Sequence, residues 1–233
     1  MRNAARKIII VGVIALSFIV ILNIDVTTKQ SVNYVISIKH LPLYLKILDF
    51  YDRHYHYLLL VREIVAGEKD DEKKVMKIME WTLKNLAKQP SELPVIDDHV
   101  WHIIVRGYGV DEQFQDVFCT LCNYAGVNAF FDKVRGDGRV RVLSFVRLGN
   151  EWRIFDAAEG IYFLNKSGKM ATIENIEKMD WHPVSIGGAL SNGLYQDLFN
   201  NLKYIDFQKW NNKRSSIQAP WARFSYFLTK PHL

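Results

Sequence analysis

Residues 106–131 read RGYGVDEQFQDVFCTLCNYAGVNAFF (Arg106–Phe131), and this stretch decides the fold. Between residues 111 and 125 the apolar side chains recur at helical spacing, at Phe114, Val117, Leu121 and Tyr124. This period predicts an amphipathic helix over Asp111–Ala125. Gly109 supplies a flexible turn before that helix, and Gly126 supplies a natural stop after it.

The residues that follow the helix predict a sheet. Val127–Lys133 and Val140–Val146 are rich in branched and aromatic residues, and glycines at 136 and 138 mark a turn between them. The next stretch, NEWRIFDAAEGIYF (Asn150–Phe163), predicts a strand over Trp152–Phe155 that ends at Asp156, and a further strand over Ile161–Phe163. A helix followed by antiparallel strands indicates an α+β domain.

Together these two stretches resemble the core of the transglutaminase-like family of papain-fold thiol enzymes. Members of that family read roughly Gly-x-Cys-Asp/Glu at a helix start and Leu-x-x-x-x-Gly-Ile/Val at its end. A His on a following strand comes next, and then Trp-x-x-x-Asp. The resemblance covers roughly residues 75–180. It implies a papain-like core, in which a helix packs on an antiparallel sheet.

Two of the three catalytic positions carry other residues in this chain. Counting back from Leu121 and Gly126, the family's cysteine falls at Asp111. Counting back from Trp152, its histidine falls at Arg141, or at Val140 or Arg139 if the turn holds one extra residue. No histidine occurs between His102 and His182. The match at the third position is Asp156, where the family has the acid that orients the histidine.

These replacements bear directly on thiol chemistry. A carboxylate suits a helix N-terminus as well as a thiolate does, so Asp111 can replace the thiolate as an anion. Arg141 can replace an imidazolium as a cation, but it cannot shuttle a proton at neutral pH. The resemblance therefore implies a degenerate member without the Cys and His of the triad. The alternative is that Asp111 is an ordinary residue of the helix and Arg141 an exposed residue of the strand.

The two cysteines and the histidines are considered as a disulfide, as a nucleophile and as metal ligands. Cys119 and Cys122 lie three apart within the predicted helix, which is poor geometry for a disulfide, and a thiol in mid-helix is typical of core packing. Cys119 remains the alternative nucleophile. His99 and His102, together with Asp97 and Asp98, could form a metal site, but packing is the favoured interpretation, so we expect no metal and no cofactor.

Further helices surround the core. Leu41–Ala66 carries an apolar stripe that Gly67 closes. Asp70 and Asp71 begin a second helix, with Lys84 and Lys88 near its end. Short helices are predicted over Ile173–Met179 and Leu194–Tyr204, whereas His182 is predicted to lie in a loop.

The N-terminus predicts a membrane anchor. Arg2, Arg6 and Lys7 precede an uncharged run from Ile8 to Ile24, at the lower limit for a membrane span, and no small-x-small cleavage motif follows. Charge before the run favours a cytoplasmic N-terminus. We expect residues 1–7 in the cytoplasm, a signal anchor over 8–24 and a domain of residues 25–233 outside the cytoplasmic membrane. A cleaved signal peptide is the alternative.

The composition and charge of the chain indicate which kinds of molecule it is expected to bind. Half of the residues (49%) are hydrophobic, which is typical of a folded domain. Without the three cationic residues at its N-terminus the chain carries 27 basic and 25 acidic residues, and no nucleic-acid-binding motif occurs. Nucleic acid is therefore not an expected partner. A membrane, a protein partner or an envelope polymer remain.

Two functions follow as hypotheses. In the first, a membrane-anchored and catalytically inactive transglutaminase-like domain binds a partner in the cell envelope, or acts as a scaffold there. In the second, an active hydrolase or acyltransferase uses Cys119, or the carboxylates Asp111 and Asp156 as a pair. For the first we expect Asp111 to cap the helix and one arginine, Arg141 or Arg139, to bridge Asp111 and Asp156 in place of the thiolate–imidazolium pair.

Overall fold

The computed structural model describes residues 2–32, 35–97, 99–136, 138–187 and 195–229. These residues divide into two compact units. The first comprises residues 1–53 with 96–98, and the second comprises residues 54–95 with 99–233. Helix α2 (Leu43–Val65) begins in the first unit and ends in the second.

The first unit contains a helix and a small antiparallel sheet. Helix α1 spans Arg2–Leu22. Strands β1 (Asp25–Val32) and β2 (Val35–Pro42) pair antiparallel from Asp25↔Pro42 to Val32↔Val35, and the short strand β4 (Ile96–Asp97) joins the other edge of β1. The sequence did not predict β1 and β2, because β1 has apolar side chains only at Val26 and Val32 and most side chains of β2 are exposed.

Helix α1 corresponds to the predicted anchor but does not meet the requirements for one. Across the described residues, no helix combines the length and the apolar character that a membrane span requires. The uncharged part of α1 runs from Ile8 to Leu22. The transmembrane helix predicted over residues 8–24 is therefore not supported, and the two-sided topology and membrane localisation stay predictions.

The second unit is an α+β core, as predicted. Its sheet has the order β10-β9-β8-β7-β6, and all of its pairs are antiparallel. Its strands are β6 (Ala129–Gly136), β7 (Arg139–Leu148), β8 (Glu151–Asp156), β9 (Ile161–Leu164) and β10 (His182–Ser185). The prediction of a loop at His182 was wrong, because this residue pairs with Leu164 at the sheet edge.

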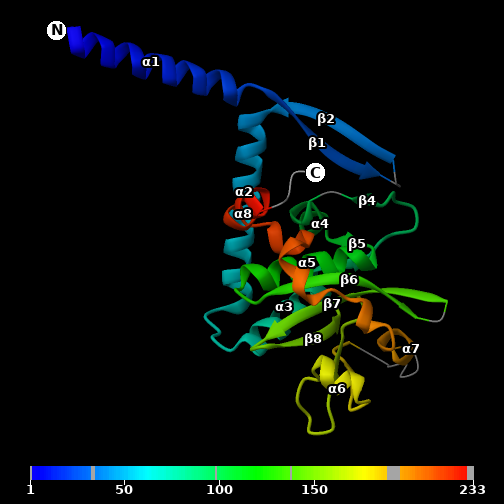
Figure 1. Cartoon of the computed structure of the whole chain (residues 1–233). Helices are drawn as coiled ribbons and strands as arrows, with labels where there is room; N and C mark the ends of the chain where they lie inside the picture. Colours follow the sequence, from blue (N-terminus) through cyan, green and yellow to red (C-terminus); the bar gives the residue numbers. More distant parts are fainter. Residues whose placement is uncertain (1, 33–34, 98, 137, 188–194, 230–233) are drawn as a thin grey trace. The chain divides into compact units, whose positions relative to one another are not determined.

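Helices cover both faces of this sheet (Figure 1). On one face lies α5 (Asp111–Tyr124), surrounded by α3 and α4 and by the end of α2. On the other face lie the shorter helices and turns of the C-terminal region. The remaining helices are α3 (Asp71–Asn85), α4 (Val100–Arg106), α6 (Ile173–Glu177), α7 (Gln196–Phe199), η2 (Leu202–Tyr204), η3 (Phe207–Asn212), η4 (Arg214–Ile217) and α8 (Pro220–Thr229).

Two differences from the predicted helices concern the C-terminal region and α3. The helix predicted over Leu194–Tyr204 is two short ones, α7 and η2, and Leu194 lies outside the described residues. Helix α3 ends at Asn85, so Lys88 is not helical. Lys88 instead lies in β3 (Ala87–Lys88), which pairs with β5 (Tyr108–Gly109) in parallel just before α5 begins.

Helix α5 is the centre of the second unit. Ten consecutive residues, Gln113–Cys122, are buried, so the helix is enclosed on all sides and has no solvent-facing stripe over this stretch. Polar side chains inside it must consequently find partners within the protein. This requirement explains the hydrogen-bond network described next.

Candidate functional site

Asp156 is the buried centre of the candidate site. It ends β8, and 1% of its surface is exposed. Its Oδ2 accepts hydrogen bonds from the Arg141 guanidinium at 3.0 Å and from the Tyr195 hydroxyl at 2.8 Å. Its Oδ1 accepts from Gln115 Nε2 at 3.1 Å and from the Glu159 amide at 3.3 Å. Both oxygens of this carboxylate therefore have donors.

Burial sets the protonation behaviour of this cluster. It raises the pKa of Asp156, although the Tyr195 hydrogen bond and the charge of Arg141 act in the opposite direction. Burial, together with the nearby Asp156 charge, also raises the pKa of Tyr195, so its hydroxyl stays a donor. Arg141 lies on β7 with a side chain that is 26% exposed. Its cation can therefore reach both the buried carboxylate and solvent.

Asp111 lies at the N-terminus of α5 but does not cap it. Val110 is the N-cap residue, and its amide donates to Gln113 Oε1 at 3.2 Å. Asp111 is the first residue of the helix, and its side chain is 56% exposed. Its Oδ1 is 2.8 Å from Lys88 Nζ. The expectation that Asp111 is the cap was therefore wrong.

A chain of ion pairs connects the two carboxylates. Lys88 Nζ contacts Glu159 Oε1 at 3.1 Å, and Glu159 Oε1 lies 3.8 Å from Arg141 Nη1. Burial lowers the pKa of Lys88, but the hydrogen bonds and charges of Asp111 and Glu159 outweigh burial and raise it. The predicted pair between Arg141 and Asp156 is confirmed. The predicted bridge from one arginine to both carboxylates is wrong, since Asp111 has Lys88 as its cation.

Cys119 is buried beneath this cluster. None of its surface is exposed, and its thiol donates to Ser144 Oγ at 3.1 Å. Ser144 in turn donates to Gln115 Oε1 at 2.6 Å, so hydrogen bonds run from the thiol to Asp156. Burial raises the pKa of Cys119 and Cys122 above the ordinary value for a thiol. Neither thiol meets the exposure and pKa that a nucleophile needs.

Gln115, Ser144, Lys88, Glu159 and Tyr195 belong to this network but were not predicted from the sequence. Gln115 and Cys119 are four residues apart and share one face of α5, which is the one available sequence signal. The other four residues come from separate elements, and the chain pattern does not indicate their proximity. The network therefore depends on tertiary structure.

A cavity of about 480 Å³ lies beside Asp111. Its lining residues are Lys88, Gln89, Gly109, Val110, Asp111 and Glu112. Asp156 is not among them. Within the described ranges, no three His, Cys, Asp or Glu side chains are grouped as metal ligands. The aspartate at position 98 of the considered His99–His102 site lies outside those ranges.

Comparisons with known proteins give a family match for part of the chain. The model of the Transglutaminase-like superfamily matches residues 59–157, a range that includes Asp111, Arg141 and Asp156. No curated protein matches the chain.

Two solved structures are similar to parts of the chain. One is a "Putative Cysteine Protease" from Cytophaga hutchinsonii, with 16% identity and a TM-score of 0.38 over 58% of this chain and 52% of that one. The other is a "putative protease" from Parabacteroides distasonis, with 12% identity and a TM-score of 0.37 over 56% of this chain and 35% of that one. The chain thus spans about half of the first protein and about a third of the second. On the family match, residues 59–157 form a core of the transglutaminase-like superfamily.

Proposed function

We propose that this transglutaminase-like domain is not a thiol enzyme and acts as a binding or scaffold module. One observation carries the proposal. At the positions that motif spacing assigns to the family's thiolate and imidazole, this chain has two carboxylate–cation pairs, Asp111 with Lys88 and Arg141 with Asp156. Such pairs preserve the charge pattern of the family site while removing its nucleophile and its proton shuttle.

The burial of the alternative groups supports the same conclusion. An active enzyme with Cys119 as nucleophile would need an accessible thiolate, yet this side chain is fully enclosed and its pKa is raised. An enzyme with paired carboxylates would need both to reach one substrate. Asp156 is buried and bonded on both oxygens, whereas Asp111 is exposed and paired with a different cation.

The cavity beside Asp111 is the candidate binding surface. It presents the carboxylates of Asp111 and Glu112 and the ammonium of Lys88, at the beginning of a helix. Its volume lies within the range of ordinary ligand pockets. Charged groups of both signs favour a polar ligand, such as a segment of a protein partner or an envelope polymer. Residence in the envelope itself remains a prediction from the N-terminal sequence.

Thiol labelling tests the loss of catalysis. We expect fluorescent iodoacetamide to leave the folded native protein unlabelled, because Cys119 and Cys122 are both fully buried. Asp111→Cys is the positive control, since this side chain is 56% exposed at a helix N-terminus, and the variant should be labelled stoichiometrically. Native labelling at Cys119 that Cys119→Ser abolishes, together with measured acyl transfer, would refute the proposal.

Binding at the cavity is tested by sedimentation with purified cell-wall polymer. We expect the native protein to sediment with the polymer and Asp111→Arg to remain largely in the supernatant, because the new cation removes an acceptor and repels Lys88. Lys169→Glu, an exposed charge change away from the cavity, should sediment like the native protein. Equal sedimentation of all three proteins would exclude this cavity as the binding surface.

A further inference from the structure

Strand β6 lies at the edge of the five-stranded sheet, so one side of its backbone faces away from β7. The amide of Arg147 donates to the carbonyl of Asn128 at 2.8 Å, and Ala129 pairs with Val146. In an antiparallel pair the bonded positions alternate. Even-numbered residues of β6 therefore bond to β7, while residues 129, 131, 133 and 135 direct their backbone groups outward.

The chain itself covers the first part of this edge. The carbonyl of Ala129 accepts hydrogen bonds from Asn123, Ser215 and Ser216, and its amide donates to Asn123 Oδ1 at 3.1 Å. These bonds also confirm the outward direction of position 129. Coverage by side chains from α5 and η4 means that no additional strand can pair here.

The second part of the edge is open. The amide of Lys133 donates to Asp132 Oδ1 at 2.8 Å. In the part of the chain that the structure describes, no hydrogen bond engages the carbonyl of Lys133, or either backbone group of Phe131 or Arg135. These are the donors and acceptors that a neighbouring strand uses. The open edge therefore begins at Phe131 and ends at Arg135.

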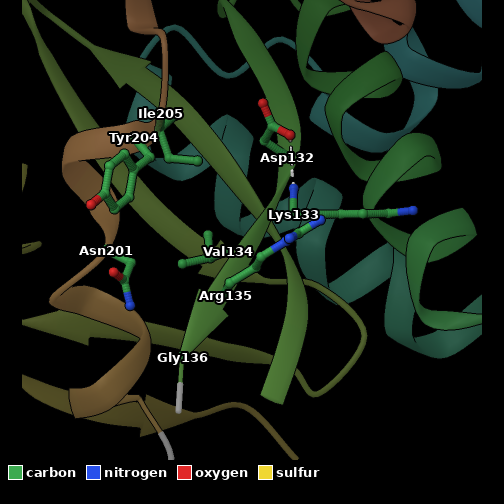
Figure 2. Close-up of a pocket in the computed structure, with 8 residues that line it drawn as sticks. All are labelled: Asp132, Lys133, Val134, Arg135, Gly136, Asn201, Tyr204 and Ile205. Atoms are coloured by element: carbon green, nitrogen blue, oxygen red, sulfur yellow. Dashed lines mark hydrogen bonds between the residues drawn. The ribbon is translucent and has the colours of Figure 1, made fainter. Parts of the chain in front are cut away.

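A cavity of about 440 Å³ lies along this open edge (Figure 2). Asp132–Gly136 line one side of it, and Asn201, Tyr204 and Ile205 line the other. Figure 2 shows the Tyr204 ring and the Ile205 side chain in the segment facing Val134. Tyr204 is 75% exposed, which is unusual for an aromatic side chain beside a cavity. The wall opposite the strand thus offers apolar surface.

The two faces of strand β6 differ in polarity along this open edge. Lys133 and Arg135 share one face, where Lys133 Nζ lies 3.4 Å from Glu112. Val134 is on the other face, packed in the core cluster that includes Leu198 and Leu202. The exposed guanidinium of Arg135 has no ion pair within the described residues. A strand added here would place alternate side chains beside Arg135 and against Tyr204.

We propose that the open edge of β6, from Phe131 to Arg135, binds an extended peptide in which acidic and apolar residues alternate. Main-chain bonds to Arg135 and to the carbonyl of Lys133 hold the peptide as a sixth strand. Acidic side chains pair with Arg135, and apolar side chains enter the cavity beside Tyr204 and Ile205. This site shares no lining residue with the cavity at Asp111, although Lys133 contacts Glu112, which lines that cavity.

Fluorescence anisotropy with designed octapeptides tests this proposal on the full chain. The probe alternates Glu and Val and carries fluorescein. One control peptide replaces Glu with Lys, and another is N-methylated at every amide, so it cannot donate main-chain hydrogen bonds to β6 in either strand direction. We expect the Glu–Val peptide to bind, and both controls to bind at least about tenfold more weakly.

Two protein variants make the test specific to the edge. Arg135→Glu should weaken binding of the Glu–Val peptide by about tenfold and strengthen binding of the Lys–Val peptide. Lys169→Glu is the matched charge reversal at an exposed turn outside the cavity and should leave both affinities unchanged. Equal effects of the two variants, or equal binding of the acidic and basic peptides, would overturn the proposal.

Amide hydrogen exchange gives an independent measure that does not require substitution. Saturating Glu–Val peptide should slow exchange of the Arg135 amide by at least about tenfold, because a strand hydrogen bond protects it. Unchanged exchange contradicts strand addition. Sedimentation velocity tests whether a second copy of the chain, rather than a peptide, occupies this edge. A dimer that Arg135→Glu dissociates would assign the edge to a second copy and would also overturn the peptide proposal.

Discussion

Replacing Gln115 with Leu is expected to lower the free energy of unfolding by about 3 kcal/mol. The Gln115 side chain is fully buried and serves three groups. Its Nε2 donates to Asp156, and its Oε1 accepts from the Ser144 hydroxyl and from the Ala157 amide at 3.1 Å. Leu fills a similar volume but offers no hydrogen bonds. Two buried donors and one carboxylate oxygen would therefore lose a partner.

Urea unfolding of the two proteins measures this effect, and Gln113→Leu is the matched control. The same change is made two residues earlier on α5, at a side chain that is also buried, with 7% exposed. Gln113 accepts a hydrogen bond from the Val110 amide, which is a cap bond worth about 1 kcal/mol. If the two variants lose equal stability, Gln115 has no special part in holding the Asp156 cluster together.

The importance of Gln115 could not be predicted from the sequence, although its helix could. Apolar spacing placed α5 at Asp111–Ala125, and the structure ends it at Tyr124. The same spacing treats residues off the apolar stripe as solvent-facing. Because the strands, neighbouring helices and C-terminal turns together enclose α5 on all sides, Gln115 is buried with no signal in the local pattern.

The site itself was predicted in part. The positions of Arg141 and Asp156 follow from motif spacing, and both residues lie just beyond the paired residues of β7 and β8, at the end where Ser144 pairs with Phe155. The partner of Asp111 does not follow in this way. Lys88 reaches it through the parallel pairing of Ala87 with Tyr108 and of Lys88 with Gly109. Two-residue strands carry no periodic signal, and the sequence placed Lys88 in a helix.

The contact of Tyr195 with Asp156 also could not be predicted from the sequence. It comes from a segment that lies 39 residues beyond Asp156, yet its hydroxyl is one of the donors to that carboxylate. Its neighbours in the sequence predict only a short helix. Contacts between distant segments depend on the packing of the C-terminal region against the sheet, so a single sequence gives no measure of them.

Replacing Arg141 with Met should lower the free energy of unfolding by about 2 kcal/mol at pH 7. The substitution keeps an unbranched side chain but removes the cation of a carboxylate that is 1% exposed. Glu159 would also lose a favourable neighbour at 3.8 Å. Tyr195, Gln115 and the Glu159 amide would still donate to Asp156, which limits the loss.

The loss should depend on pH in a definite direction. The pKa of Asp156 in the folded protein is already raised by burial, so ionising this carboxyl works against folding. That unfavourable contribution begins near the unfolded-state pKa of about 3.9 and is complete above the folded-state pKa. Without Arg141 the folded-state pKa rises further. The variant should therefore differ little from the native protein near pH 4 and most at pH 7.

Urea unfolding at pH 4 and pH 7 measures both parts of this expectation. Lys178→Met is the control, because it removes one partner of a fully exposed pair with Glu174, and its unfolding midpoint in urea should match that of the native protein at either pH. An Arg141→Met loss of equal size at both pH values would mean that packing of the arginine stem, rather than its charge, stabilises the protein. In that case the pair between Arg141 and Asp156 could not stand in for the ion pair of the family's thiol site, because its charge would contribute nothing to the fold.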